Sequence, residues 1–305
     1  MQTKNTARDY IAYLLLLGIG IVWGGQFLFN VQALKYFPPL TVAASRTLIG
    51  AVTLTFALRF GLEKPSPFRQ CSWSLRFLFV AIALFEAVLP MFLIIWGQQH
   101  VVSSVTAVIV GSVPIVTLIL SVFLSKKNYF SFSSGLSVAL GFIGIVVLVK
   151  PSTSNLGWDN FIYEIAILGG VVGFALGVIL FEKIPHGTPI HAARNVLWIA
   201  SVPLTIAALV LDKPWILKWG VDGVMSLIVL GVVASGCAYV MYALLIQRRG
   251  PVFTSFSNFI VPLVGVLLGV MVRGERFGTK ELVALVLIIG ALAVNELNLL
   301  SRKVD

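Results

Sequence analysis

Ten long apolar runs, separated by short polar segments, follow one another along the 305 residues of this chain. They cover approximately residues 11–30, 39–58, 75–97, 101–124, 131–149, 162–182, 189–211, 221–246, 251–272 and 278–299. A helix needs about 20 apolar residues to cross the hydrocarbon core of a bilayer, and each run has roughly that length. The runs lack the period-two alternation of barrel strands, so only helices can satisfy their backbone amides inside lipid. The pattern therefore predicts an all-α integral membrane protein with ten transmembrane helices.

The composition supports this pattern and excludes other classes of protein. Apolar residues make up 58% of the chain and charged residues 11%, whereas a soluble domain carries about a quarter charged residues. The net charge is +10, but 20 of the 22 basic residues lie in loops or at helix ends, where membrane proteins place them. The two cysteines, Cys71 and Cys237, give neither a disulfide framework nor a metal-binding spacing. We expect no nucleic-acid partner, no metal and no cofactor.

The distribution of basic residues predicts the orientation in the membrane. With the N-terminus in the cytoplasm, the inner segments carry 13 Lys and Arg residues and the outer segments carry 7. An excess of Lys and Arg marks the cytoplasmic side of a membrane protein. We therefore expect a multi-pass protein of the cell inner membrane, with both termini in the cytoplasm.

An internal repeat divides the chain into two halves. Its matched residues are Gly25 and Gly173, Pro114 and Pro262, and Tyr129 and Phe277, each pair 148 apart, with Pro39 and Pro189 at 150. Because five helices make up one unit, the second unit enters the membrane from the opposite side. Such inverted repeats are the arrangement that many secondary transporters use for alternating access around a central site. An old duplication kept only as a scaffold is the alternative.

The repeat predicts the domain organisation, with the two halves arranged around a central cavity. The expected parts are a cytoplasmic tail at 1–10, a first repeat at 11–149, an outer linker at 150–161, a second repeat at 162–299 and a cytoplasmic tail at 300–305. Ten helices are enough to form a complete pathway, so we expect a monomer.

Several motifs recur in the same order as in a known family. The first half contains Trp23-Gly24 and then PPLTVAASRTLIGAVTL, which places Pro39 at the start of a helix and Arg46 seven residues further on. The second half contains GPVFTSFSNFIVPLVGVLLGVMVRGERFGTKEL, with Pro262 in mid-helix and a turn at 274–276. From about Tyr13 to Leu299, the chain resembles the drug/metabolite transporter superfamily, and within it the ten-helix EamA-like family.

This resemblance implies a transporter and not an enzyme, often an exporter of amino acids or other small metabolites across the bacterial inner membrane. It also implies a cavity lined mainly by helices 1, 3, 4, 6, 8 and 9, with helices 5 and 10 at the periphery. The chain departs from the pattern at Lys126-Lys127-Asn128, where a Gly-Glu-Arg-like turn is common. Helix 1 lacks the membrane glutamate that small multidrug resistance relatives use for proton coupling, so drug–proton antiport is not carried over from them.

Glu86 is the acidic residue that stands out within an apolar run. It lies about eleven residues into the run 75–97, roughly 16 Å along a helix and thus near the bilayer midplane. A charged side chain there costs about 2.5–3.5 kcal/mol on insertion scales. Glu86 therefore has two candidate functions, as a proton carrier or as the partner of a substrate amine. The structural alternatives are an ion pair with Arg46 and a carboxyl kept neutral by packing.

Two arginines occupy corresponding positions in the two halves. Arg46 lies roughly 10 Å below the outer end of its helix, and Arg194 takes the inverted counterpart position. A guanidinium at this depth can hold a carboxylate in a bidentate pair, extend to the membrane surface, or brace unwound backbone. We favour a structural or gating role for both, because the family pattern includes an arginine here without a shared substrate.

Other polar and aromatic side chains share helix faces that suit a cavity lining. Residues three or four apart lie on one face of a helix. The predicted substrate-binding residues besides Glu86 are Trp23, Gln26, Asn30, Tyr239, Tyr242, Ser255 and Asn258. The alternatives are interfacial anchoring for Trp and Asn and hydrogen bonding between helices.

Prolines and one glycine are predicted to have structural or gating roles. Pro90, Pro114 and Pro262 interrupt helices where backbone carbonyls can face a cavity or permit bending. Gly173 allows close helix contact and motion, and tight packing without motion is its alternative.

The functional prediction is a carrier of small organic metabolites, amino acids or similar solutes, working in the export direction by alternating access. Its partners are the lipid bilayer and a small-molecule substrate, with protons if Glu86 couples transport. Proton-coupled drug efflux and a membrane-embedded lipid-modifying enzyme are the alternatives. His186 and His191 form no HExxH frame, no P-loop follows a strand, and neither charge rings nor filter loops indicate a channel.

Overall fold

The computed structural model describes residues 2–63, 73–98, 100–101, 109–125, 131–149, 161–185, 188–273 and 279–301, and every regular element among them is helical. Six of these helices are long and apolar enough to cross a membrane: Tyr10–Leu34, Pro39–Arg59, Trp73–Gly97, Phe161–Phe181, Pro189–Asp212 and Val221–Ser255. Three shorter apolar helices are Ile109–Leu124, Phe132–Val147 and Leu282–Val294.

The first repeat is built from five helical passes. Their elements are α1 (Gln2–Leu34), α2 (Pro39–Arg59), the continuous series α3 (Trp73–Ile82), η2 (Ala83–Val88) and α4 (Leu89–Gln98), a fourth pass that includes α6 (Val113–Leu124), and α7 (Phe132–Val149). The segment η2 is π-helical, and Pro90 follows it in the first turn of α4. Helix α1 begins at Gln2, so residues 2–10, predicted as a tail, form the first turns of this helix.

The second repeat has the same order of elements. They are α8 (Phe161–Phe181), α9 (Pro189–Ala207) with its π-helical end η5 (Ala208–Asp212), the short turn η6 (Pro214–Ile216), the series α10 (Val221–Val229), η7 (Leu230–Cys237) and α11 (Ala238–Ser255), then α12 (Ser257–Arg273) and α13 (Thr279–Ser301). Within α11 the chain turns at Gly250, whose φ of 82° is a left-handed conformation that favours glycine. This turn, followed by Pro251, separates the eighth pass from the ninth.

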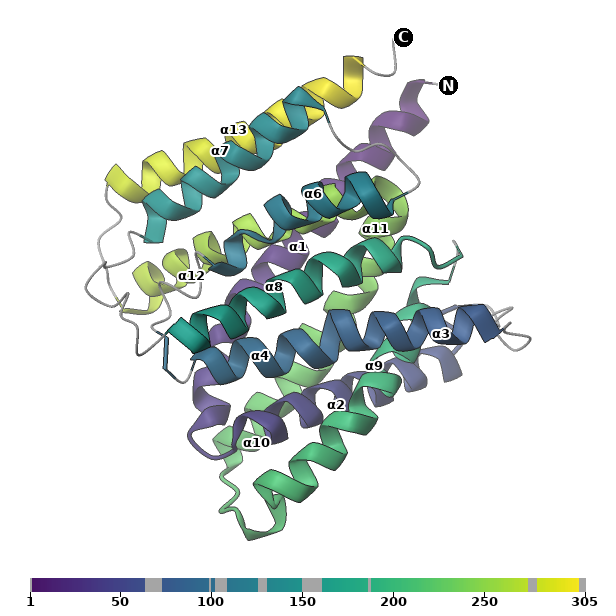
Figure 1. Cartoon of the computed structure of the whole chain (residues 1–305), viewed down its shortest axis with the longest axis vertical. Helices are drawn as coiled ribbons and strands as arrows, with labels where there is room; N and C mark the ends of the chain where they lie inside the picture. The colour runs from purple at the N-terminus through teal and green to yellow at the C-terminus, as the bar shows by residue number, and fades with distance from the viewer. Residues whose placement is uncertain are drawn as a thin grey trace.

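Equivalent helices of the two repeats run in opposite directions. Helices α7 and α13 lie side by side (Figure 1). The Ser137 hydroxyl donates to the Ala291 carbonyl, while Gly144, further along α7, lies against Leu287 and Ile288, which come earlier in α13. The two repeats are therefore inverted relative to each other, as the odd number of helices predicts.

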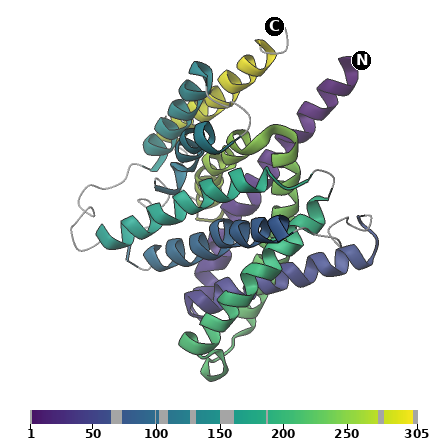
Figure 2. The same ribbon diagram turned by 45° about the vertical axis from the view of Figure 1, so that its right-hand side comes forward.

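The chain ends and the outer surface fit a bundle that spans a bilayer. Both termini lie at the same end of the molecule (Figures 1 and 2). Large apolar side chains point outward all around it, and Phe123 is 79% exposed. Such a surface is stable in lipid, where exposed apolar groups meet hydrocarbon instead of water.

Several sequence predictions lie outside the described residues. They concern the turns at 126–128 and 274–276, the matched pair Tyr129 and Phe277, Cys71, His186 and nearly all of the linker at 150–161.

Candidate functional site

A cavity of about 130 Å³ lies between the two repeats, large enough for several water molecules. Its lining residues are Trp23, Gln26, Asn30, Arg46, Pro90, Met91, Ile94, Ile95, Val110, Val113, Phe174, Tyr239, Tyr242, Asn258, Val261 and Pro262. They come from helices 1, 3, 4, 6, 8 and 9 and from one residue of helix 2. Helices 5 and 10, which are α7 and α13, contribute none.

The cavity follows the symmetry of the repeat. Five pairs of lining residues are 148 positions apart: Gln26 and Phe174, Met91 and Tyr239, Ile94 and Tyr242, Val110 and Asn258, and Val113 and Val261. Equivalent positions of two inverted repeats meet only around the axis that relates them. The cavity therefore lies on the pseudo-twofold axis between the repeats.

The two sides of the cavity differ in chemistry. In four of the five pairs one member is polar or carries a hydroxyl and the other is apolar. The polar members, Gln26, Tyr239, Tyr242 and Asn258, stand on α1, α11 and α12, and α1 packs against both other helices. We call these four the polar wall. Their apolar counterparts, Met91, Ile94, Val110 and Phe174, form the apolar wall, where α4 packs against α8.

Arg46 adds a guanidinium to the polar wall. Its side chain is only 6% exposed. Nε donates to the Ser235 hydroxyl at 3.1 Å, and Nη2 donates to Oε1 of Gln26 at 2.7 Å. Among the described residues no carboxylate pairs with it, so the ion pair with Glu86 that the sequence left open is not formed. Arg46 is instead held in place by two neutral groups from α1 and η7.

The π-helical segments η2 and η7 present backbone carbonyls to the cavity edge. The Tyr239 hydroxyl donates to the Glu86 carbonyl at 3.3 Å, and Nε1 of Trp23 donates to the Ala234 carbonyl at 3.1 Å. Positions 86 and 234 are 148 apart, so the same carbonyl is used in each repeat. A π-helical turn leaves carbonyls without their usual helical partners and is frequent at functional sites. Here the two carbonyls accept hydrogen bonds from aromatic side chains that line the cavity.

Glu86 lies behind the cavity and not in its lining, which differs from the prediction. The side chain is fully buried. Neither oxygen of its carboxyl has a hydrogen-bond partner among the described residues. A Cβ built on Gly177 would lie 2.7 Å from Cβ of Glu86 and would also meet Oε2, so this glycine makes the space that the carboxyl occupies. Tyr239 and Tyr242 line the cavity, and the Tyr239 hydroxyl donates to the backbone carbonyl of Glu86.

Ser255 also lies outside the lining, because its hydroxyl turns back and donates to the Val252 carbonyl at 2.7 Å. Asn258, one turn later, donates to the Ser255 carbonyl at 3.0 Å and reaches the cavity. The six residues that do lie around the cavity as predicted are Trp23, Gln26, Asn30, Tyr239, Tyr242 and Asn258. Their role in binding stays a prediction.

The predicted structural residues occupy different places. Pro90 and Pro262 line the cavity, whereas Pro114 is buried at the start of α6 and does not. A Cβ on Gly173 would lie 3.0 Å from the Phe85 carbonyl and 3.2 Å from Cγ of Pro90. Gly173 thus allows α8 to pack directly on η2 and α4.

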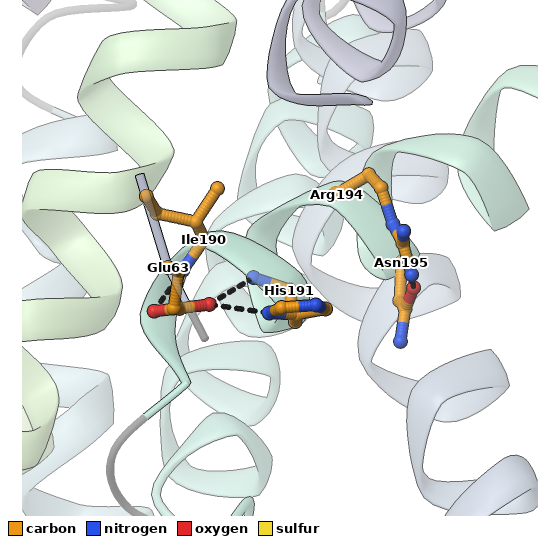
Figure 3. A network of polar contacts seen from close by, with 5 residues as sticks. All are labelled: Glu63, Ile190, His191, Arg194 and Asn195. Atoms are coloured by element: carbon orange, nitrogen blue, oxygen red, sulfur yellow. Dashed lines mark hydrogen bonds and ion pairs between the residues drawn. The ribbon is translucent and has the colours of Figure 1, made fainter. Parts of the chain in front are cut away.

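Arg194 has surroundings unlike those of Arg46, although the two are 148 positions apart. It is half-buried and does not line the cavity. Its Nε and Nη2 both donate to Oδ1 of its neighbour Asn195, at 3.1 and 2.6 Å (Figure 3). The pairing is local to α9, so Arg194 has no part in the described cavity.

Two carboxylates cap the antiparallel helices α2 and α9 at opposite ends. Oδ2 of Asp212 accepts from the Thr41 backbone N–H at 2.7 Å and from the Thr41 hydroxyl at 2.8 Å. Glu63 accepts from the backbone N–H groups of Ile190 and His191 at 3.2 and 3.0 Å, and Nδ1 of His191 lies 2.5 Å from Oε2 (Figure 3). A carboxylate at a helix N-terminus satisfies unpaired donors and complements the dipole.

Sequence reasoning missed the apolar wall and both caps. Apolar residues inside an apolar run carry no signal of their own. The repeat supplies one, because adding or subtracting 148 from the predicted Gln26, Tyr239, Tyr242 and Asn258 gives the whole apolar wall. In the part of the chain that the structure describes, no group of three His, Cys, Asp or Glu residues could hold a metal ion.

Comparison with known proteins places the chain among membrane transporters. Residues 10–150 and 161–296 both match the EamA-like transporter family. The chain is 27% identical to the uncharacterized inner membrane transporter YedA of Escherichia coli K12, over 92% of this chain and 88% of that protein. It is 21% identical to the uncharacterized transporter YoaV of Bacillus subtilis, over 95% and 98% of the two chains. A solved crystal structure with 19% identity has the same fold, with a TM-score of 0.74 over 96% of this chain and 98% of that one.

Proposed function

Because this chain belongs to the EamA-like transporter family, we propose that it carries small organic metabolites, such as amino acids, across the inner membrane by alternating access. The family makes it a membrane transporter and not an enzyme. The resemblance favours net export, and the basic residues favour both termini in the cytoplasm.

The observation that carries this proposal is the position of the cavity on the axis between two antiparallel repeats. Secondary transporters built from inverted repeats bind their substrate at that interface and exchange access by moving one repeat against the other. The two walls of the cavity suit a solute that is polar on one side and apolar on the other. The glycines Gly173 and Gly177 bring α8 against η2 with little side chain between them, which suits sliding of one helix over another.

The proposed cycle requires that access from the end that holds the termini is closed in this conformation. Leu16, Phe181 and Phe253 belong to one buried core, and the Tyr13 ring packs against Phe253 with ring centroids 5.4 Å apart. During the proposed cycle this core opens while the cavity closes. One side of the bundle is therefore tightly packed at each stage.

Flux through purified protein tests the proposal. Proteoliposomes loaded with radiolabelled amino acids should release at least one of them much faster than empty liposomes do. A Val113→Trp variant fills the cavity and should reduce flux to the empty-liposome rate. Val122→Trp, on the exposed face of the same helix α6, should keep wild-type flux. Protease treatment of a C-terminal tag in right-side-out and inverted vesicles gives the orientation for each rate.

Two results would contradict the proposal. One is well-folded wild-type protein that moves no amino acid or similar metabolite. The other is Val113→Trp protein that transports as well as Val122→Trp, since transport would then not pass through this cavity.

A further inference from the structure

Arg46 is a buried charge whose counter-charge is not supplied by the described protein. The side chain is 6% exposed, and its partners Ser235 and Gln26 are neutral. Buried charges in proteins are paired or bind an ion, because an isolated one is costly to desolvate. Glu86 does not serve as the pair, because the hydrogen bonds of Arg46 to described residues go to Ser235 and Gln26, and neither carboxyl oxygen of Glu86 has a hydrogen-bond partner among those residues.

The guanidinium is held so that one edge remains available to a solute. Arginine has five N–H donors in a rigid fork, and its hydrogen bonds to Ser235 and Gln26 use Nε and Nη2. Nη1 has no hydrogen bond to a described residue, and Arg46 is part of the cavity lining. A carboxylate is the group that matches this planar fork, in a pair that is short and charge-assisted.

A second unpaired polar group lies on the same wall. Asn30 stands one helical turn beyond Gln26 on α1, and both line the cavity. Its Oδ1 is buried and has no hydrogen-bond partner among the described residues. Residues four apart on a helix have Cβ atoms about 5–6 Å apart. An acceptor therefore lies within one turn of the residue that Arg46 contacts.

The opposite side of the cavity is apolar. Met91, Ile94 and Phe174 face it from α4 and α8, and none of them provides a strong donor or acceptor. A solute that presents a carboxylate and an amine to α1 and α2 would place its side chain against this apolar wall.

We propose that Arg46 binds the carboxylate of the transported solute, that Oδ1 of Asn30 accepts a hydrogen bond from its amine, and that the apolar wall selects an apolar side chain. This assignment rests on the proposed transport function and adds to it the residues that bind the two charged groups of an amino carboxylate and the wall that selects its side chain. Arg194, at the equivalent position of the other repeat, has no such role.

Binding of matched ligands to the purified protein tests this assignment. Isothermal titration would compare phenylalanine with phenylalaninamide, which lacks the carboxylate, and with 3-phenylpropionate, which lacks the amine. The wild-type protein should bind phenylalanine about 10- to 100-fold more tightly than the amide, the range expected for a buried hydrogen-bonded charge pair. The Arg46→Gln variant should lose this preference and still bind the amide as the wild type does, which also shows that it is folded.

Three further variants make the test specific. Arg194→Gln should keep the full preference. Arg46→Lys, which keeps the charge but not the fork, should keep part of it. Asn30→Leu should reduce the preference for phenylalanine over 3-phenylpropionate and leave that over the amide intact.

The assignment is overturned if the wild-type protein binds phenylalanine and phenylalaninamide equally tightly. It is also overturned if the protein binds neither of them while it transports another solute. It is also overturned if Arg46→Gln weakens both ligands equally, because that pattern indicates a structural arginine. Failure of the proposed function has a different signature, the absence of flux in the wild-type proteoliposomes.

Discussion

The third helix of each repeat contains a π-helical segment at the same position, Ala83–Val88 in the first repeat and Leu230–Cys237 in the second. In both, one carbonyl accepts a hydrogen bond from an aromatic side chain of the cavity. The side chains of the two segments differ. The first buries the carboxyl of Glu86 beside Gly177, and the second presents Ser235 to the guanidinium of Arg46.

This difference shows that the two repeats share a backbone arrangement but not a set of polar side chains. The order of the helices, the π-helical turns and the capped ends of α2 and α9 recur in both halves. The charged groups do not have equivalent surroundings in the two halves. Arg46 faces the cavity, while Arg194 pairs with its own neighbour. Glu86 has the uncharged Ala234 as its counterpart. A symmetric scaffold can exchange its two halves during transport, while the asymmetric side chains allow it to recognise a solute that has two unlike ends.

The largest expected effect, on pH-driven transport, comes from removing the carboxyl of Glu86, which has no counterpart in the other π-helical segment. If Glu86 carries protons, Glu86→Gln should abolish the part of transport that an imposed pH gradient drives, because an amide cannot exchange the proton. Solute-gradient-driven flux should remain. Asp222→Asn, which removes an exposed carboxylate from the third helix of the other repeat, should leave the pH dependence intact. Full gradient dependence in Glu86→Gln protein would exclude the proton-carrier role and leave Glu86 as a buried structural group.

A smaller effect is expected at the glycines that pack against the segment Ala83–Val88. An added Cβ at Gly173 would lie 3.0 Å from the Phe85 carbonyl oxygen and 3.2 Å from Cγ of Pro90, so Gly173→Ala should lower the free energy of unfolding by about 1–3 kcal/mol. For Gly25, the counterpart of Gly173 in the first repeat, Leu268 at 4.0 Å is the one described residue within reach of the added Cβ. Gly25→Ala should therefore be neutral or raise stability by up to about 1 kcal/mol. Unfolding by SDS titration in mixed micelles measures both, and equal effects would mean that the two repeats pack alike.

The smallest effects are expected at the two carboxylate caps. Glu63→Ala and Asp212→Ala each remove acceptors from a helix N-terminus, which costs roughly 0.5–2 kcal/mol. Glu63 should give the larger loss, since it contacts two backbone N–H groups and the His191 ring, whereas Asp212 accepts from one described residue, Thr41. The same SDS titration should show additive losses in the double variant, because the caps lie at opposite ends of α2. Strong non-additivity would indicate that the two ends move together.

Part of the site could be predicted from single residues. Polar side chains in apolar runs are expensive in lipid, so the sequence alone identifies Gln26, Asn30, Tyr239, Tyr242 and Asn258 as cavity candidates. Glu86 and Ser255 meet the same criterion but lie outside the lining. For Ser255 the reason is local, since a serine hydroxyl can return to a carbonyl of its own helix. For Glu86 it is a glycine 91 positions away that makes room for the carboxyl.

The number of helices, their order and the inversion of the two repeats could all be predicted without the structure. These follow from the length of the apolar runs and the odd number of helices per unit, because lipid requires every spanning segment to satisfy its own backbone. Only the tertiary structure decided which arginine faces the cavity, which hydrocarbon wall faces the polar one, and which carboxylates cap α2 and α9. Each depends on side chains that meet from distant helices, and their closeness is set by packing between helices and not by the order of residues along the chain.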